Sequence, residues 1–276
     1  MTDSNTGNFS KAMSGDYRIP IKAIFLEAWY RVKGMKASFW LGFLYFVLIM
    51  AVACIVLGLV LAIYDIDILQ MATAHNTLTF YNLKLALKFL IVGIIEILRF
   101  LLTASLAYLA LNHLRRLPIR ASMVFSFSHA WRPLVMIGLL LYLFNSLLLS
   151  GTNIILHSTL VHEQISSLGL SLGLIYLIEL LVFLFCFFFY FYFSIVVFMS
   201  VLLILDKKIA WKESLALSFQ SVNQHWFKNI SLIVITSFVF GLLTLITLGI
   251  GLIWLLPMTS LVTAIQYNQI FCEGNL

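Results

Sequence analysis

One apolar stretch limits what this chain can fold into more than any other feature. It runs for 38 residues, over positions 168–205, and Glu179 is its single charged side chain. It contains no proline, and its glycines lie near its start, so nothing in its interior interrupts a helix. A helix of this length extends about 57 Å, nearly twice the thickness of a bilayer core. The stretch predicts one long tilted membrane helix, and two shorter crossings are the alternative.

Apolar segments of the same character occur along the rest of the chain. Hydrophobic residues make up 62% of it and charged residues 10%, whereas soluble domains have about 25% charged residues. The runs are continuous, which is typical of transmembrane helices and not of β-barrel strands. With the long stretch, five further segments predict six spans: residues 39–63, 85–111, 134–156, 227–245 and Leu252–Phe271.

Basic residues indicate how these spans are oriented. Of the 17 Lys and Arg residues, six lie in residues 1–36, four in 112–133 and four in 206–228, all on the same side of a six-span arrangement. Because basic loops stay in the cytoplasm, we expect both termini there. Residues 1–18 have no apolar core and no visible signal peptide, so we expect a disordered tail and targeting by the first span.

A short pattern recurs at the start of each pair of spans. A basic residue is followed six positions later by a small residue and seven positions later by an aromatic one. The three sets are Lys22, Ala28 and Trp29; Arg120, Ser126 and Phe127; and Lys212, Ser218 and Phe219. Apolar residues around them recur at helical spacing, which is typical of helices in the headgroup plane that bind anionic lipid. The alternative is that these segments are ordinary basic connectors.

The recurrence predicts an internally repeated fold. We expect one transmembrane domain over residues 19–276, with repeats at 19–113, 117–206 and 209–271. The fold class is then an all-α polytopic membrane protein of six transmembrane helices. They form three hairpins, each preceded by a cytoplasmic amphipathic interfacial helix. In the last hairpin, Gly249 and Gly251 suit a tight turn between antiparallel helices.

Three charged residues lie well inside predicted spans, away from their ends. Glu96 and Arg99 lie three residues apart on the second span, hence on one helix face, and Glu179 lies at a similar depth on the fourth. Asn145 on the third span is a further polar candidate for the interior. Such groups are costly in a bilayer and seek partners. They form either a centre that binds a substrate headgroup or moves a proton, or a Glu–Arg–Glu clasp that fixes helix register.

Motifs that carry catalysis or cofactor binding are absent from the sequence. It has no Walker, Rossmann or HExxH pattern, and Cys54, Cys186 and Cys272 are isolated. We therefore expect no catalytic residues, no metal site, no cofactor and no nucleic-acid partner. Membrane lipids are the expected partners, with membrane proteins or a second copy of the chain as further possibilities.

The C-terminal part of the chain resembles a known group of proteins. Residues 203–206, 212–218, 249–252 and 256–258 carry the resemblance, which is clearest over residues 200–271. They resemble the YciC-like family of bacterial inner-membrane proteins and the membrane domain attached to some glycerophosphodiester phosphodiesterases. The resemblance implies a six-helix bacterial inner-membrane protein. The chain has no soluble phosphodiesterase domain, so that activity is not implied.

These observations favour a non-enzymatic, multi-pass protein of the bacterial inner membrane. Its interfacial helices would bind lipid, and its role would be envelope maintenance or support of other membrane proteins. The alternative is a small transporter or lipid-handling protein that uses Glu96, Arg99 and Glu179. A continuous polar cavity that reaches Arg99 would favour transport, and a dry, closed bundle would favour a structural role.

Overall fold

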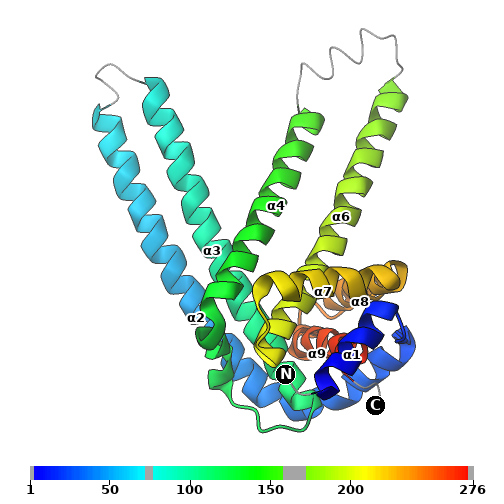
Figure 1. The fold of residues 1–276 in the computed structure, drawn as a ribbon. Coiled ribbons are helices and arrows are strands. Elements are labelled where there is room, and N and C mark those ends of the chain that lie inside the picture. The colour runs from blue at the N-terminus through cyan, green and yellow to red at the C-terminus, as the bar shows by residue number, and fades with distance from the viewer. Residues whose placement is uncertain (1–2, 72–76, 158–171, 273–276) are drawn as a thin grey trace.

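The computed structural model describes residues 3–71, 77–157 and 172–272 of the chain, and nearly all of them are helical (Figure 1). The first half of the chain contains α1 (Asp3–Ser14), α2 (Ile21–Met71), α3 (Thr77–Leu114), the 3-10 helix η1 (Ala121–Ala130) and α4 (Trp131–His157). The second half contains α6 (Leu172–Lys207), α7 (Trp211–Gln224), α8 (Trp226–Ile246) and α9 (Leu252–Phe271). The all-helical class is confirmed.

Among the described residues, four segments are long and apolar enough to cross a membrane. They are Ile21–Val60 in α2, Ala121–Leu148 in η1 and α4, Leu180–Lys207 in α6, and Trp226–Ile246 in α8. These four segments support the prediction that the chain is a membrane protein. The six crossings and the three equivalent hairpins stay predictions.

The described part of the long apolar stretch forms a single helix. α6 is continuous for 36 residues, Leu172–Lys207, so the part of the stretch that the structure describes is one helix, as predicted, and not two. Lys208 follows in the left-handed region, with φ 56°, and turns the chain towards α7.

The repeat predicted that the first interfacial segment is a separate helix. In the structure this segment is instead the start of α2. No proline and no turn cluster occurs between Ile21 and Met71, so the backbone hydrogen bonds continue for 51 residues. The chain bends instead, and the first turns of α2 run across the base of the molecule before the helix rises (Figure 1).

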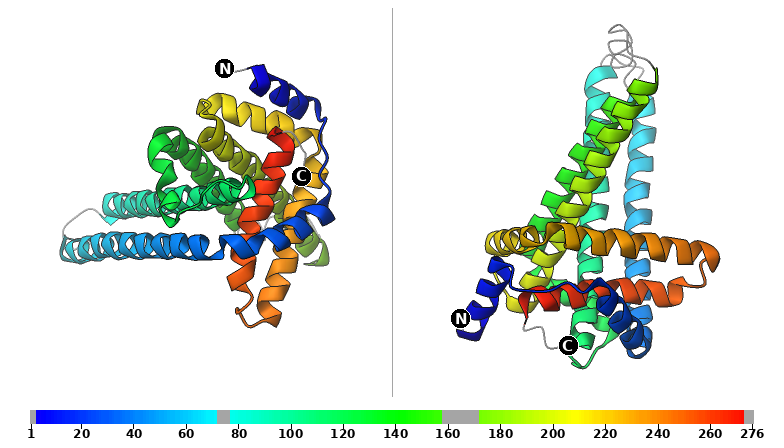
Figure 2. Two further views of the ribbon diagram at one scale, coloured as in Figure 1. Left: turned by 90° about the horizontal axis from the view of Figure 1, so that it is seen from below. Right: turned by 90° about the vertical axis from the view of Figure 1, so that its right-hand side faces the viewer.

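The long helices form two arms that diverge from a compact base (Figure 1). One arm contains α2 and α3, and the other contains α4 and α6. The antiparallel pair α8 and α9 lies across the base instead of running beside the arms (Figure 2). α9 contacts both α2 and α3, and most of its length after Leu255 is buried.

The buried core lies in the base. It joins the first part of α2, the ends of α3 and α6, and α9, with side chains such as Ile24, Leu109, Met199 and Tyr267 fully enclosed. Farther along the arms the apolar side chains are exposed, as at Val52 of α2, which is 61% exposed. Exposed aliphatic and aromatic side chains over a whole helix suit contact with lipid.

The N-terminal segment also differs from the predicted disordered tail. α1 packs against α7 and α9, and Phe9 and Ala12 are buried in the core. The linker after α1 is held to α7, where the hydroxyl of Tyr17 donates to the carbonyl oxygen of Ser221 at 2.6 Å. Such tertiary contacts stabilise a helix whose own sequence is a poor helix former.

The predicted turn between the last two helices is confirmed. Leu248 and Gly249 have φ values of 50° and 87°, a left-handed conformation that closes the end of α8. The amide of Gly249 donates to the carbonyl oxygen of Thr244 at 2.8 Å. Pro257 lies inside α9 without ending the helix.

Candidate functional site

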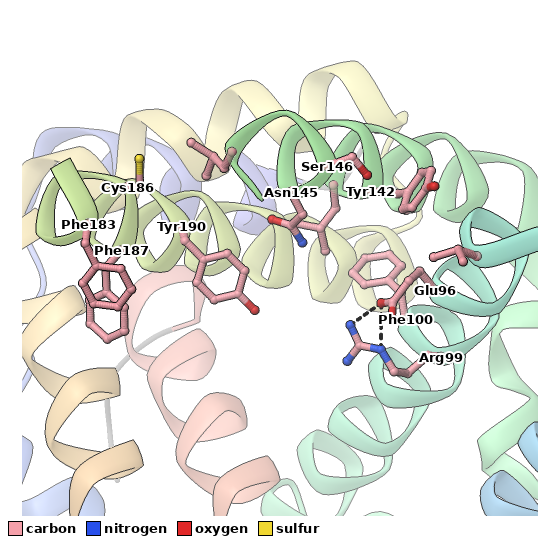
Figure 3. Close-up of a pocket in the computed structure, with 14 residues that line it drawn as sticks. Glu96, Arg99, Phe100, Tyr142, Asn145, Ser146, Phe183, Cys186, Phe187 and Tyr190 are labelled. Carbon is pink, nitrogen blue, oxygen red and sulfur yellow. Dashed lines mark hydrogen bonds and ion pairs between the residues drawn. The ribbon is translucent and has the colours of Figure 1, made fainter. Parts of the chain in front are cut away.

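A cavity of about 580 Å³ lies between α3, α4 and α6 (Figure 3). Most of its wall is apolar and aromatic, with Phe100 and Leu141 buried beside it and Phe183 and Phe187 on the α6 side. Polar side chains from all three helices line the same space. The cavity is therefore amphipathic: it is half open, its wall is mostly apolar, and it has one polar region.

Glu96 and Arg99 form the charged part of this region, as their spacing on one helix face predicted. Nε and Nη2 of Arg99 lie 2.9 Å and 2.5 Å from the same oxygen, Oε2 of Glu96. The Arg99 and Glu96 side chains are 51% and 39% exposed in the protein alone. The pair is compensated in charge but not enclosed, so its remaining hydrogen-bonding capacity faces the cavity.

Asn145 of α4 brings a further polar group to the cavity. Its Oδ1 atom is buried and has no hydrogen-bond partner among the described residues. Tyr190 of α6 carries its hydroxyl towards the same space (Figure 3). By contrast, Tyr142 is already satisfied, because its hydroxyl donates to the carbonyl oxygen of Phe89 at 2.7 Å. An unpaired buried acceptor indicates a position at which a bound molecule can donate a hydrogen bond.

Two glycines allow the helices to approach closely along this wall. A Cβ atom at Gly93 of α3 would lie 2.9 Å from Tyr142, and one at Gly138 of α4 would lie 3.0 Å from Phe100. Both distances are shorter than an ordinary contact, so larger residues would push α3 and α4 apart. The absence of side chains at these positions keeps the two helices together beside the cavity.

Glu179 was predicted to share this site. It belongs to α6, but its side chain lies outside the described residues. The predicted contact between Arg99 and Glu179 therefore stays a prediction.

The predicted interfacial residues lie in the base, away from the cavity. Lys22 and Lys212 are exposed, and the aromatic residues seven positions later, Trp29 and Phe219, are 50% and 51% exposed. The small residues between them, Ala28 and Ser218, are both fully buried. Residues 21–30 and 211–220 have the same sequence of buried, half-buried and exposed positions. The first and third copies thus expose the same faces.

The middle copy has a different structure. Arg120 is exposed and Phe127 is half-buried, but the segment is the 3-10 helix η1, and its buried residue is Val124. Serine, valine, phenylalanine and histidine are weaker helix formers than alanine or leucine, and Pro133 cannot donate an α-helical hydrogen bond back into this segment. We therefore do not find three identical interfacial α-helices.

A second polar cluster joins helix ends in the base, and it was not predicted from the sequence. Arg115, just after α3, forms a two-bond ion pair with Asp206 of α6, and the hydroxyl of Tyr267 of α9 donates to the same carboxylate at 2.9 Å. Arg115 also donates to Sγ of Cys272 at 3.1 Å. Burial raises the pKa of the Cys272 thiol, although the charge of Arg115 opposes this. The one sign of this cluster in the sequence was an acidic residue, Asp206, among the basic residues at the helix ends.

Metal binding is not indicated in the part of the chain that the structure describes. Among those residues no group of three or more His, Cys, Asp or Glu side chains converges. No protein-family model, no curated protein and no solved structure matches this chain. The YciC-like resemblance accordingly stays a prediction, and function has to be argued from the site alone.

Proposed function

We propose that this protein is a lipid-handling membrane protein that holds one amphiphilic molecule in the cavity between α3, α4 and α6. The observation that supports this most directly is the position of the Glu96–Arg99 pair on an apolar-walled cavity. Cavities of about 300–1,000 Å³ with few polar groups in a hydrophobic lining are typical of small-molecule sites. The polar region would hold the headgroup, and the aromatic wall would contact the chain.

The geometry favours this function over a purely structural clasp. A clasp that only fixes helix register would bury both charges and pair them fully. Buried, fully paired charges are the arrangement that can specify how helices pack. Arg99 instead directs both described hydrogen bonds to one carboxylate oxygen and remains half exposed. Its planar guanidinium retains N–H donors that suit the oxygen atoms of a phosphate or carboxylate headgroup.

We further propose the bacterial inner membrane as the location, with both termini in the cytoplasm, and a non-enzymatic role. The location is supported by the concentration of basic residues at the base, and the YciC-like resemblance is in line with it. In this orientation the cavity lies along the arms. Arg99 lies 16 residues before Arg115, about 24 Å along the helix axis from the basic end of α3.

A second candidate function rests on the interfacial residues. Lys22 with Trp29 and Lys212 with Phe219 are exposed in the same register on two helices of the base. A cation beside an exposed aromatic residue suits the boundary of an anionic leaflet. The protein would then act on the cytoplasmic surface of the membrane, as a support for envelope lipids or for other membrane proteins.

Native mass spectrometry of the protein released from lipid nanodiscs distinguishes the two functions. We expect wild type to retain about one lipid molecule, and Arg99→Leu to reduce this retention about tenfold, the effect of losing hydrogen bonds to a charged group. The double variant Lys22→Leu/Lys212→Leu is the control and should retain lipid as wild type does. Loss of retention in the control with full retention in Arg99→Leu would instead support the interfacial function. Equal retention in all three proteins would contradict the cavity proposal.

A further inference from the structure

The polar region of the cavity contains both unused acceptors and unused donors. Because both hydrogen bonds of Arg99 end on Oε2 of Glu96, Oε1 of Glu96 and Nη1 of Arg99 have no partner among the described side chains. Oδ1 of Asn145, which is buried, is unpaired as well. A headgroup that only accepts, or only donates, would leave part of this set unsatisfied.

The charge of the site gives a second constraint. Glu96 and Arg99 have opposite charges that cancel, and the described lining contains no other ionisable group apart from Cys186 and the two tyrosines. A headgroup with a net negative charge would therefore carry an uncompensated charge into an apolar cavity, which is costly. A headgroup with one positive and one negative group matches the pair without changing the net charge.

We infer that the cavity selects a zwitterionic amphiphile whose cationic end is a primary ammonium, as in a phosphoethanolamine lipid. This inference rests on the proposed function. The phosphate oxygens accept hydrogen bonds from the unused N–H groups of Arg99. The ammonium donates to Oε1 of Glu96 and to Oδ1 of Asn145, which leaves neither acceptor unpaired.

A phosphocholine headgroup provides the matched comparison. It has the same two charges, but its quaternary nitrogen has no N–H group and cannot donate a hydrogen bond. Bound in the same place, it would leave Oδ1 of Asn145 unsatisfied in a buried position. The hydrogen bond to Asn145, and not the charge alone, then distinguishes the two headgroups.

The test uses the full-length protein in nanodiscs made from equal amounts of phosphoethanolamine, phosphocholine and phosphoglycerol lipids with identical chains. Native mass spectrometry measures the ratio of retained headgroups. We expect about a tenfold enrichment of phosphoethanolamine over phosphocholine in wild type. Asn145→Leu should abolish the enrichment but keep retention, and it should fold, because it removes an unpaired buried polar group. Asn223→Leu, an exposed position on α7, is the control and should keep the enrichment.

The outcomes separate the inference from the function on which it rests. Equal retention of the three headgroups, with retention still lost in Arg99→Leu, would overturn the headgroup selection and leave the cavity function standing. Enrichment of phosphoglycerol would also overturn it, because it would show selection for a net negative charge. Enrichment that survives in Asn145→Leu would overturn the role of the Asn145 acceptor. No retention of any lipid by wild type would overturn the proposed function itself.

Discussion

The guanidinium of Arg115, in the turn after α3, is paired through two hydrogen bonds with the carboxylate of Asp206 near the end of α6. The Asp206 side chain is 9% exposed and that of Arg115 27%. Tyr267 brings α9 to the same carboxylate. The pair therefore joins three helices at the base, where the buried core lies and from which the two arms diverge.

Removal of this pair should destabilise the base. Arg115→Leu leaves the largely buried Asp206 carboxylate with Lys207, at 3.9 Å, as its one remaining ion-pair partner among the described residues. We expect the free energy of unfolding to fall by on the order of 3 kcal/mol, as for other broken buried ion pairs. Thermal unfolding in detergent measures the change, with the exposed Arg120→Leu as the control. An unchanged melting temperature for Arg115→Leu would show that the pair does not hold the base together.

The turn between α8 and α9 should depend on the backbone of one glycine. Gly249 has φ 87° and open space around its Cα, so Gly249→Ala introduces no clash but places an alanine in the left-handed region. We expect a loss of about 1 kcal/mol in the free energy of unfolding. Gly241→Ala is the matched control, because it also meets open space but lies inside α8. The control should be neutral or stabilising, and equal effects of the two substitutions would contradict this reading.

Two buried serines on one face of α7 should respond differently to alanine. Ser214 donates to the carbonyl oxygen of Ser200 at 2.6 Å, and the two hydroxyl oxygens also lie 2.6 Å apart. Ser218, one turn later, is equally buried but has no hydrogen-bond partner among the described residues. Ser214→Ala should lower the free energy of unfolding by about 1 kcal/mol, whereas Ser218→Ala should be neutral or stabilising. Denaturant titration of both variants measures the two changes in the free energy of unfolding. A larger loss for Ser218→Ala than for Ser214→Ala would refute the prediction.

The Cys272 thiol should be protected from alkylation in the folded protein. Burial raises its pKa, so the folded protein holds the thiol proton more tightly than the unfolded chain does. At about pH 8 the folded thiol contains less reactive thiolate, and its reaction rate should rise as the pH is increased towards the raised pKa. The stability linked to this proton is present at neutral pH and is lost as the pH rises above the unfolded pKa.

A variant with Cys54→Ser and Cys186→Ser isolates this thiol for measurement. The rate of reaction with iodoacetamide is compared between the folded protein and the same protein in denaturant, across a series of pH values. A folded rate equal to the denatured rate at about pH 8 would show that Cys272 is neither buried nor shifted.

The sequence predicted the helices better than their directions. The last predicted span, Leu252–Phe271, coincides with the helix α9, because hydropathy and the glycine-containing turn define its ends. The orientation of α8 and α9 across the base could not be predicted in this way. Hydropathy reports how apolar a segment is but not which neighbours it contacts, and α9 is apolar because it is buried against α2 and α3.

The candidate site was predictable only in part, for a related reason. Glu96 and Arg99 were identified as a pair because three residues separate them on one helix. The cavity next to them arises from the divergence of α3, α4 and α6, which is a tertiary property. Arg115 and Asp206 are 91 residues apart in the sequence. No local sequence pattern specifies a contact between residues so far apart along the chain.

The central claim is that one lipid occupies the cavity, and crosslinking with a photoreactive lipid tests it most directly. Reacted peptides are mapped by mass spectrometry in the protein embedded in nanodiscs, in wild type and in Arg99→Leu. We predict labelling concentrated at cavity residues such as Leu141, Phe183 and Phe187, and its loss in Arg99→Leu. Equal labelling of exposed apolar residues of α2, such as Val52 and Ile55, with no effect of Arg99→Leu, would show ordinary bilayer contact and contradict a bound lipid.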